Sequence, residues 1–171
     1  MNFEITKASE VKVRKVEWLW YPFIPFGKVT VIQGDAGDGK STFILKLAAM
    51  LTNGEPMPFT DGNNLEPMNI IYQSTEDAAD ETIVPRFISA GGNTEKLVFI
   101  NEKEHFLSFS DERLLEAIRA TKAKLIILVP LSAYIGESTS INSANEVRSQ
   151  FRPLIDIAKE QGCAIVIVFI I

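Results

Sequence analysis

The chain has 171 residues, of which 46% are hydrophobic and 23% charged, with a formal net charge of −5. These proportions are ordinary for a globular domain and exclude a disordered or fibrous protein, while the negative charge counts against a surface that binds nucleic acid everywhere. The start lacks the pattern of a signal peptide, and no apolar run approaches the ~18 residues of a membrane span, so we expect a cytoplasmic protein without a membrane partner.

The first 27 residues are predicted to form a segment of their own that packs on the core. Residues 16–26 contain Trp18, Trp20 and two prolines. The prolines exclude a continuous helix or a central strand, whereas the aromatic side chains require burial. For the two tryptophans, core packing, contact with adenine and contact with a neighbouring subunit all stay open as interpretations. Residues 28–171 then form the predicted core.

The core is predicted to begin with strand, loop and helix. Residues 28–33 are a β-branched run that ends at a glycine, which favours a strand. Residues 40–51 follow with apolar residues at helical spacing. These residues are Phe43, Leu47 and Met50.

The same alternation of strand and helix continues along the chain. Residues 69–74 are predicted to form a strand, residues 76–90 a helix interrupted at Pro85, and residues 97–100 another strand. Gly91 and Gly92 mark the end of that helix.

Two further helices and two strands complete the core. Asp111 is the predicted cap of a helix that continues through Thr121, and residues 124–129 form an almost wholly apolar strand, as strands covered on both faces are. Ser143 can cap the last helix, which ends at Gly162 and contains Pro153. Its apolar face comprises Val147, Phe151, Leu154, Ile155 and Ala158.

The last predicted strand spans residues 164–171, and Cys163 before it is interpreted as a small buried residue. The strand has no turn after it, so we expect the chain to be cut short within the last strands. Residues 138–143 are the predicted mobile loop. Five strands alternating with helices predict an α/β fold, an open and mostly parallel sheet flanked by helices on both faces, with ligands at the carboxyl ends of the strands.

The glycine-rich loop matches the Walker A pattern in full, between an apolar strand and a helix start. Its glycines let backbone N–H groups turn toward phosphates, Lys40 can reach the β and γ phosphates, and the Ser41 hydroxyl can bind Mg²⁺. ATP and Mg²⁺ are therefore the predicted cofactors. The predicted nucleotide contacts are Gly34, Asp35, Ala36, Gly37, Asp38, Gly39, Lys40, Ser41 and Thr42. The side chains of Asp35 and Asp38 are expected to point to solvent and to weaken affinity slightly.

Two further motifs accompany the Walker A loop. The first is a second strand that ends in an acid, Glu76, and the other is the apolar strand followed by Pro130 and Leu131. With these motifs, residues 15–171 resemble RecA-like AAA-type ATPases related to plasmid replicative hexameric helicases and to DnaB-like and RadA-like proteins. The resemblance implies a RecA-like P-loop fold, with Glu76 and Lys40 as catalytic residues and Glu76 as the general base. The alternative for Glu76 is an acid in the first helical turn that complements the helix dipole.

Two positions depart from the pattern of that family. Val129 stands where the family has the Walker B aspartate that holds the Mg²⁺ water shell, and Phe169 and Ile170 stand near its polar sensor residue. Both changes replace polar groups with apolar ones. Hydrolysis is expected to suffer more than binding, because metal placement matters most in the transition state.

The resemblance implies an ATP-driven motor or switch in DNA replication or repair, assembled as a homo-oligomer such as a hexamer, with DNA as a further partner. The alternative is a nucleotide-binding module with impaired or no hydrolysis, and a small-molecule kinase is a third hypothesis that the lack of an arginine-rich lid disfavours. Arg148 and Arg152 are interpreted either as a solvated helix face or as a DNA contact or arginine finger. His105 is expected at the surface.

Overall fold

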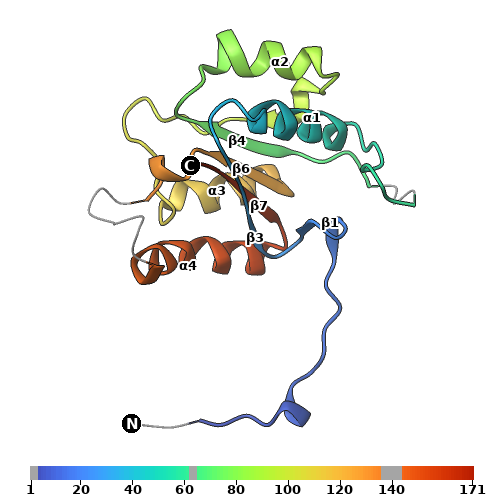
Figure 1. Cartoon of the computed structure of the whole chain (residues 1–171), viewed down its shortest axis with the longest axis vertical. Coiled ribbons are helices and arrows are strands. Elements are labelled where there is room, and N and C mark those ends of the chain that lie inside the picture. The colour runs from blue at the N-terminus through green and yellow to red at the C-terminus, as the bar shows by residue number, and fades with distance from the viewer. Residues whose placement is uncertain (1–3, 62–64, 136–143) are drawn as a thin grey trace.

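The computed structural model describes residues 4–61, 65–135 and 144–171. Its centre is a five-stranded sheet in which all neighbouring strands are parallel (Figure 1). The strand order is β3 (Val29–Gly34), β7 (Ala164–Ile170), β6 (Leu125–Val129), β4 (Ile70–Ser74) and β5 (Leu97–Val98). The predicted open α/β sheet of the RecA-like P-loop class is confirmed.

Helices cover both faces of the sheet (Figure 1). On one face lie α1 (Lys40–Thr52) and α2 (Val84–Ser89), and on the other lie α3 (Glu112–Thr121) and α4 (Ala144–Gln161). Two separate apolar clusters fill the space between the sheet and these two helical layers. The sheet is therefore buried from both sides, as its apolar strands require.

Strand β6 contributes side chains to both apolar clusters. Its residues are all buried, and Leu125, Ile127 and Val129 belong to the cluster under α1 and α2. Ile126 and Leu128 belong to the cluster under α3 and α4. This alternation follows from the two-residue period of a strand, and it confirms the predicted central strand.

The apolar residues predicted for two helices are not all buried. Phe43 is 44% exposed and packs against the Trp20 ring at a centroid distance of 6.0 Å. In α4, Ile155 is 45% exposed, while Leu154 and Ala158 are fully buried. The helix predicted from Phe43, Leu47 and Met50 is confirmed as α1, whereas the predicted apolar face of α4 wrongly included Ile155, because spacing does not tell which neighbours flank the buried stripe.

The predicted helix over residues 76–90 begins later and changes form along its length. A π-helix, η2 (Ala79–Ile83), leads into α2, with Pro85 in the first positions of the α-helical part. The Ser74 hydroxyl accepts the N–H groups of Glu76 and Asp77, which turns the chain before a helix can start. The change from π-helix to α-helix falls just before Pro85, whose missing N–H is tolerated in the first turn of a helix.

Strand β5 is shorter than the predicted run over residues 97–100. The backbone N–H of Ile100 donates to the Gln73 side chain, and the Gln73 amide donates to the Ile100 carbonyl at 3.1 Å. These bonds replace the ladder bonds that a longer strand would form. The short helix η3 (Thr94–Lys96) directly precedes β5. The short helix η4 (Leu131–Ala133) follows β6.

Other sequence predictions hold or lie outside the described residues. Asp111 caps α3, its side chain accepting the N–H of Arg113. Cys163 is fully buried, as expected, and this burial raises the pKa of its thiol to about 11. The Ser143 cap and the loop over 138–143 lie outside the described residues. In the described ranges, no helix is both long and apolar enough to span a membrane.

The N-terminal part divides into a packed hairpin and an exposed arm. Strands β1 (Trp18–Trp20) and β2 (Ile24–Pro25) pair antiparallel. Trp20 is buried in the cluster under α1 and donates its indole N–H to the Pro58 carbonyl at 2.9 Å. Residues 4–17, which include the short helix η1 (Ala8–Glu10), are exposed and extend away from the body (Figure 1).

Candidate functional site

The carboxyl ends of the parallel strands meet at one edge of the sheet. The glycine-rich loop follows β3, Glu76 follows β4, Val129 ends β6, and Phe169 and Ile170 end β7. Residues from four separate parts of the sequence therefore gather where ligands bind in open α/β sheets.

The loop between β3 and α1 has the backbone geometry of an anion site. Gly37 and Gly39 adopt φ angles of 89° and 79°, a region that side chains disfavour. Gly39 is the N-cap of α1 and supplies no side-chain cap. Within the described residues the helix start has no side-chain cap, so its first N–H groups, together with the helix dipole, favour a bound anion.

Lys40 lies over this loop. Its Nζ atom donates a hydrogen bond of 2.9 Å to the Gly34 carbonyl and another to the Asp35 carbonyl. Ser41 is half-buried beside it, and Thr42 is exposed. A bound phosphate could replace the two weak carbonyl acceptors by a charged one, since hydrogen bonds between ionised groups are the stronger kind.

The Asp38 side chain is exposed, as expected, but it also forms a hydrogen bond within the loop. Its Oδ2 atom accepts the N–H of Asp35 at 2.9 Å, which draws the carboxylate across the loop toward Gly34. A Cβ added at Gly34 would come within 2.8 Å of that oxygen, so this position requires glycine or a displaced carboxylate. Asp38 thus adds a negative charge to the edge of the predicted phosphate site.

Glu76 is exposed in the loop after β4 rather than in a helix. The acids of the first turn of η2 are Asp80 and Glu81, so the alternative that Glu76 complements a helix dipole was wrong. Two strands separate β4 from β3, which places their ends roughly 14 Å apart at ~4.8 Å per strand. Glu76 can therefore face a phosphate bound by the loop only across the ends of β6 and β7.

The end of β6 is dry. Val129 is 1% exposed, aligned with Ser74, and its side chain belongs to the apolar cluster under α1 and α2. Its carbonyl accepts the N–H of Thr75 at 3.1 Å and the Tyr134 hydroxyl at 3.4 Å. Among the described residues, no group of three His, Cys, Asp or Glu side chains could hold a metal ion. The predicted metal contact at Ser41 thus has no carboxylate partner on this strand.

Tyr72 was not predicted as a site residue. It is fully buried on β4, and its hydroxyl has no hydrogen-bond partner in the part of the chain that the structure describes. Burial, followed by the charge of Asp77, raises the pKa of this hydroxyl far above its usual value, while Arg86 acts in the opposite direction. No sequence pattern marks this residue, since a tyrosine in an apolar strand is normally a packing residue.

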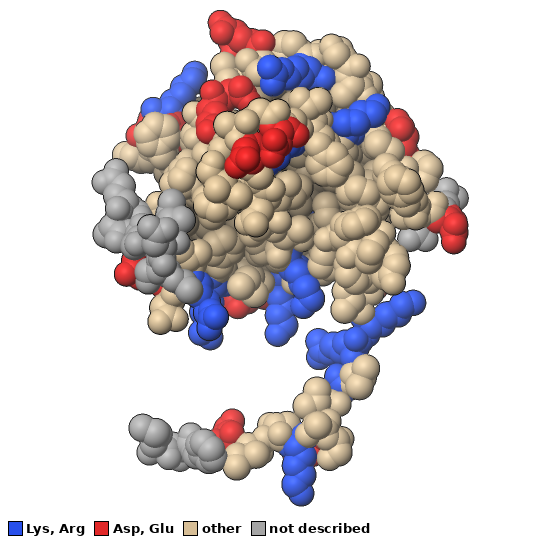
Figure 2. Space-filling model, in the orientation of Figure 1, with Lys and Arg blue, Asp and Glu red and all other residues tan. Residues whose placement is uncertain are grey.

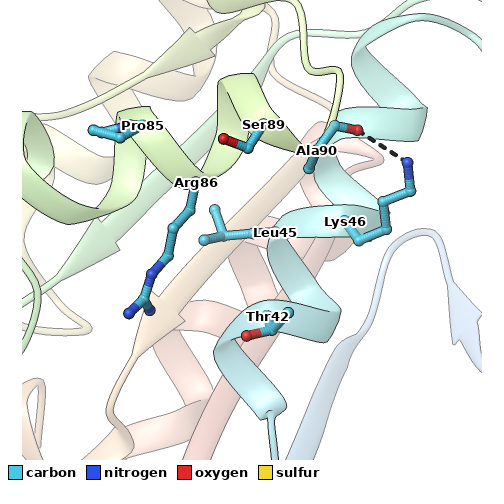
Figure 3. Close-up of a pocket in the computed structure, with 7 residues that line it drawn as sticks. All are labelled: Thr42, Leu45, Lys46, Pro85, Arg86, Ser89 and Ala90. Atoms are coloured by element: carbon cyan, nitrogen blue, oxygen red, sulfur yellow. Dashed lines mark hydrogen bonds between the residues drawn. The ribbon is translucent and has the colours of Figure 1, made fainter.

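Arg86 was also missed. It lines a cavity between α1 and α2 together with Thr42, the residue after Ser41, and its side chain extends toward the Thr42 end (Figure 3). No hydrogen bond or ion pair engages its guanidinium within the described ranges. No sequence pattern marked it, because only the packing of α2 on α1 brings it into the same cavity as Thr42.

The remaining candidates lie away from this edge or are used structurally. Arg148 and Arg152 are exposed on α4, which leaves both of their interpretations open. His105 is exposed, as predicted. Arg113 bonds to Asp111 at 2.7 Å and to carbonyls of the loop after β5, and this bonding lowers the pKa of the Asp111 carboxyl.

A family model described as an AAA domain matches residues 3–169, nearly the whole chain. A search of curated proteins finds no match. The matched range includes the loop at Gly34–Ser41, the acid after β4 and the dry end of β6.

Proposed function

Because the chain belongs to the AAA domain family of nucleotide-binding ATPases, we propose that it is a RecA-like ATP-binding motor or switch domain that acts in DNA replication or repair. The observation that carries the proposal is the loop between β3 and α1. There a helix start without a side-chain cap, two glycines with positive φ and Lys40 lie within one short loop. Backbone N–H groups and a lysine that face one point are what a triphosphate requires.

The chain's own residues divide the work of binding. Loop N–H groups hold the phosphates, and Lys40 exchanges its two carbonyl acceptors for phosphate oxygens. The donor set suits Mg²⁺ held chiefly by the nucleotide's oxygens, with Ser41 as the protein ligand, since this ion commonly keeps several waters. When bound, Mg²⁺ supplies charge neutralisation at the phosphates.

ATP turnover would depend on the residues at the ends of β4 and β6. Glu76 is exposed at the same edge of the sheet as the phosphate loop, and it can accept a proton from water as general base. The buried Val129 favours the second candidate function, a nucleotide-binding module with impaired or no hydrolysis. The two candidates share the phosphate loop and differ only in what happens after binding.

Self-association and DNA binding belong to the proposal. The exposed arm over residues 4–17 carries Val11 and Val13, 59% and 92% exposed, and in this proposal a second copy covers them. Figure 2 shows acidic and basic residues interspersed over the body, with basic side chains near its lower rim and on the arm. Any DNA contact is thus local, through cations such as Arg148 and Arg152 on α4, and strongly salt-dependent.

Thermal unfolding with and without MgATP tests the shared proposal. At a hundredfold excess over Kd, ATP should stabilise the native chain by about 2.7 kcal/mol, or roughly 5–10 °C for a domain of this size. Lys40→Ala should abolish the shift. Lys28→Ala is the matched control, because Lys28 is exposed before β3 and should leave the shift intact. Equal shifts in wild type and Lys40→Ala would disprove nucleotide binding at this loop.

Light scattering and salt titration test the partners. We expect nucleotide to promote assembly, and deletion of residues 4–17 to weaken it. Binding to single-stranded DNA should be weak at physiological salt and should fall steeply as salt is raised. A strict monomer with and without MgATP would favour the nucleotide-binding module.

A further inference from the structure

Strand β3 forms a free edge of the sheet. It stands at one end of the strand order, and among the described strands only β7 pairs with it. The carbonyls of Lys28 and Gly34 accept N–H groups from the β7 side. Because the hydrogen-bonding direction alternates along a strand, the N–H and C=O groups of Val29, Val31 and Gln33 point away from β7. No other described residue bonds to these outward groups.

An apolar groove lies between this edge and α4, with a cavity of about 660 Å³. Val31 of the strand is 43% exposed and Ile155 of the helix is 45% exposed, while Phe151, which also lines the groove, is half-buried. Single exposed apolar residues are normal on a protein surface, but apolar side chains from two elements that line one groove indicate an interaction site. The groove therefore favours a bound partner over open solvent.

Cations stand at both ends of the groove. Lys159 lies at the amino end of β3, where a Cβ added to Gly27 would lie 4.0 Å from the Lys159 Cα. Arg148 lies about three turns earlier on the same helix, about 16 Å away along its axis, toward the other end of β3. No acid is among the residues that line the cavity, and neither cation forms an ion pair within the described ranges. Basic side chains also gather at the lower rim in Figure 2, where α4 lies in Figure 1.

These features restrict the kind of molecule that fits. The free edge offers N–H donors and C=O acceptors in alternation, which another extended polypeptide matches at the spacing of a sheet. A nucleic acid backbone offers phosphate acceptors but no donors at that spacing. The apolar centre, with Val31, Phe151 and Ile155, favours an apolar side chain. Lys159 and Arg148 favour an acid near each end, because complementary charges fix the register of a partner.

We propose that the groove between β3 and α4 binds an extended segment of a partner protein, which adds a strand to β3 and carries an apolar residue between two acids. Alternate side chains of a strand share one face, so acids at the first and fifth positions and an apolar residue at the third all face the groove. The first and fifth Cα atoms of such a segment are about 13 Å apart. This span suits two cations on long side chains about 16 Å apart along α4. The proposal goes beyond nucleotide binding and does not require it.

Peptide binding tests the proposal with charge as the variable. The probes are two fluorescein-labelled peptides, Thr-Glu-Thr-Val-Thr-Glu-Thr and the same peptide with lysine in place of glutamate. Fluorescence anisotropy measures their binding to wild type, Lys159→Glu, Arg148→Glu and Arg119→Glu. Arg119 is the matched control, because it lies on α3, which covers the same face of the sheet, and does not line the groove. All three substituted side chains are exposed, so the variants should fold.

We expect wild type to bind the glutamate peptide about tenfold more tightly than the lysine peptide. Lys159→Glu and Arg148→Glu should each narrow or reverse this preference, whereas Arg119→Glu should keep it. When the glutamate peptide binds, hydrogen exchange at the amides of Val29 and Val31 should slow, because an added strand protects them.

Equal affinity for the two peptides, no binding of the glutamate peptide, or binding without slower exchange at Val29 and Val31 would overturn the proposal. So would binding of oligothymidylate that is lost in Arg148→Glu while the glutamate peptide does not bind, which would assign the groove to nucleic acid. None of these outcomes bears on MgATP binding, which the melting test with Lys40→Ala decides separately.

Discussion

The loop after β3 and the end of β6 lie at the same edge of the sheet but differ in chemistry. The loop presents backbone donors and Lys40, whereas β6 ends in Val129, which is 1% exposed within an apolar cluster. Phosphate binding needs N–H groups and a cation, all of which the loop has. Hydrolysis also needs individual carboxylates at fixed places, and β6 has none. Binding and turnover can thus be altered separately in this chain.

The two regions also respond differently to substitution. Most donors of the loop are main-chain groups, so they survive changes of side chain as long as Gly37 and Gly39 keep their positive φ angles. At the end of β6, one side chain decides whether a metal ligand is present. Side-chain substitutions at the end of β6 should therefore change stability and turnover more than most side-chain substitutions in the loop.

The largest expected effect comes from placing the missing acid. Val129→Asp puts a carboxylate in a fully buried position, so the nucleotide-free protein should lose about 3–5 kcal/mol of stability, or roughly 10 °C in Tm. MgATP should restore part of this loss and raise ATP turnover, with little change in nucleotide affinity, because the acid acts through metal placement in the transition state. Melting curves and steady-state assays measure both effects.

Val129→Thr is the control for this substitution. It adds a polar atom of similar size without a charge, so it should cost less stability and leave turnover at the wild-type level. A folded Val129→Asp protein that binds ATP but hydrolyses none would contradict the motor hypothesis and leave the nucleotide-binding module.

The next effect concerns Glu76, on the opposite side of the dry strand. A general base contributes roughly a hundredfold or more to rate, so Glu76→Gln should lower kcat about a hundredfold and erase any gain in Val129→Asp, while Kd for ATP stays the same. Asp77→Asn, at the neighbouring position, is the control. If Asp77→Asn removes turnover and Glu76→Gln does not, the base has been assigned to the wrong acid.

The elements of this site were predictable wherever short-range pattern decides structure. The Walker A spacing identified the loop from Gly34 to Ser41, and the apolar run over 124–129 identified a strand buried on both faces. The start of the helix after Glu76 was misplaced because a side chain, Ser74, takes the backbone N–H groups there. Propensity alone does not reveal that competition.

Features that depend on packing could not be predicted. The cavity beside Arg86 exists only because α2 is bonded to α1 through Lys46 and Asn53. Tyr72 looks like any strand residue until its hydroxyl is found buried without a partner among the described residues. Both depend on contacts between distant parts of the chain, which periodicity does not encode.

A smaller effect is expected from Tyr72, whose unpartnered hydroxyl lies on the hydrolytic side of the comparison. Removing a buried polar atom without a partner relieves a desolvation cost, so Tyr72→Phe should raise stability by about 1 kcal/mol, or roughly 3 °C in Tm. Tyr134→Phe should instead lower stability, because the Tyr134 hydroxyl donates a hydrogen bond to the Val129 carbonyl. Calorimetric melting measures both, and a loss of stability in Tyr72→Phe would mean that its hydroxyl is bonded in solution.

The smallest effect tests the loop itself, the binding side of the comparison. Asp38 carries its charge across the loop toward Gly34, and one unit charge about 5 Å from another interacts by about 0.8 kcal/mol in water. Asp38→Asn keeps an oxygen that can accept the Asp35 N–H but removes the charge. It should therefore tighten ATP binding about fourfold.

The gain in ATP affinity should shrink at 1 M salt, where the screening length is only about 3 Å. Asp35→Asn is the matched control, since the Asp35 side chain forms no hydrogen bond in the described part of the chain and should have a smaller effect. Weaker ATP binding by Asp38→Asn would show that this carboxylate maintains the shape of the loop, and its charge would then be a structural requirement of the phosphate site rather than a cost to it.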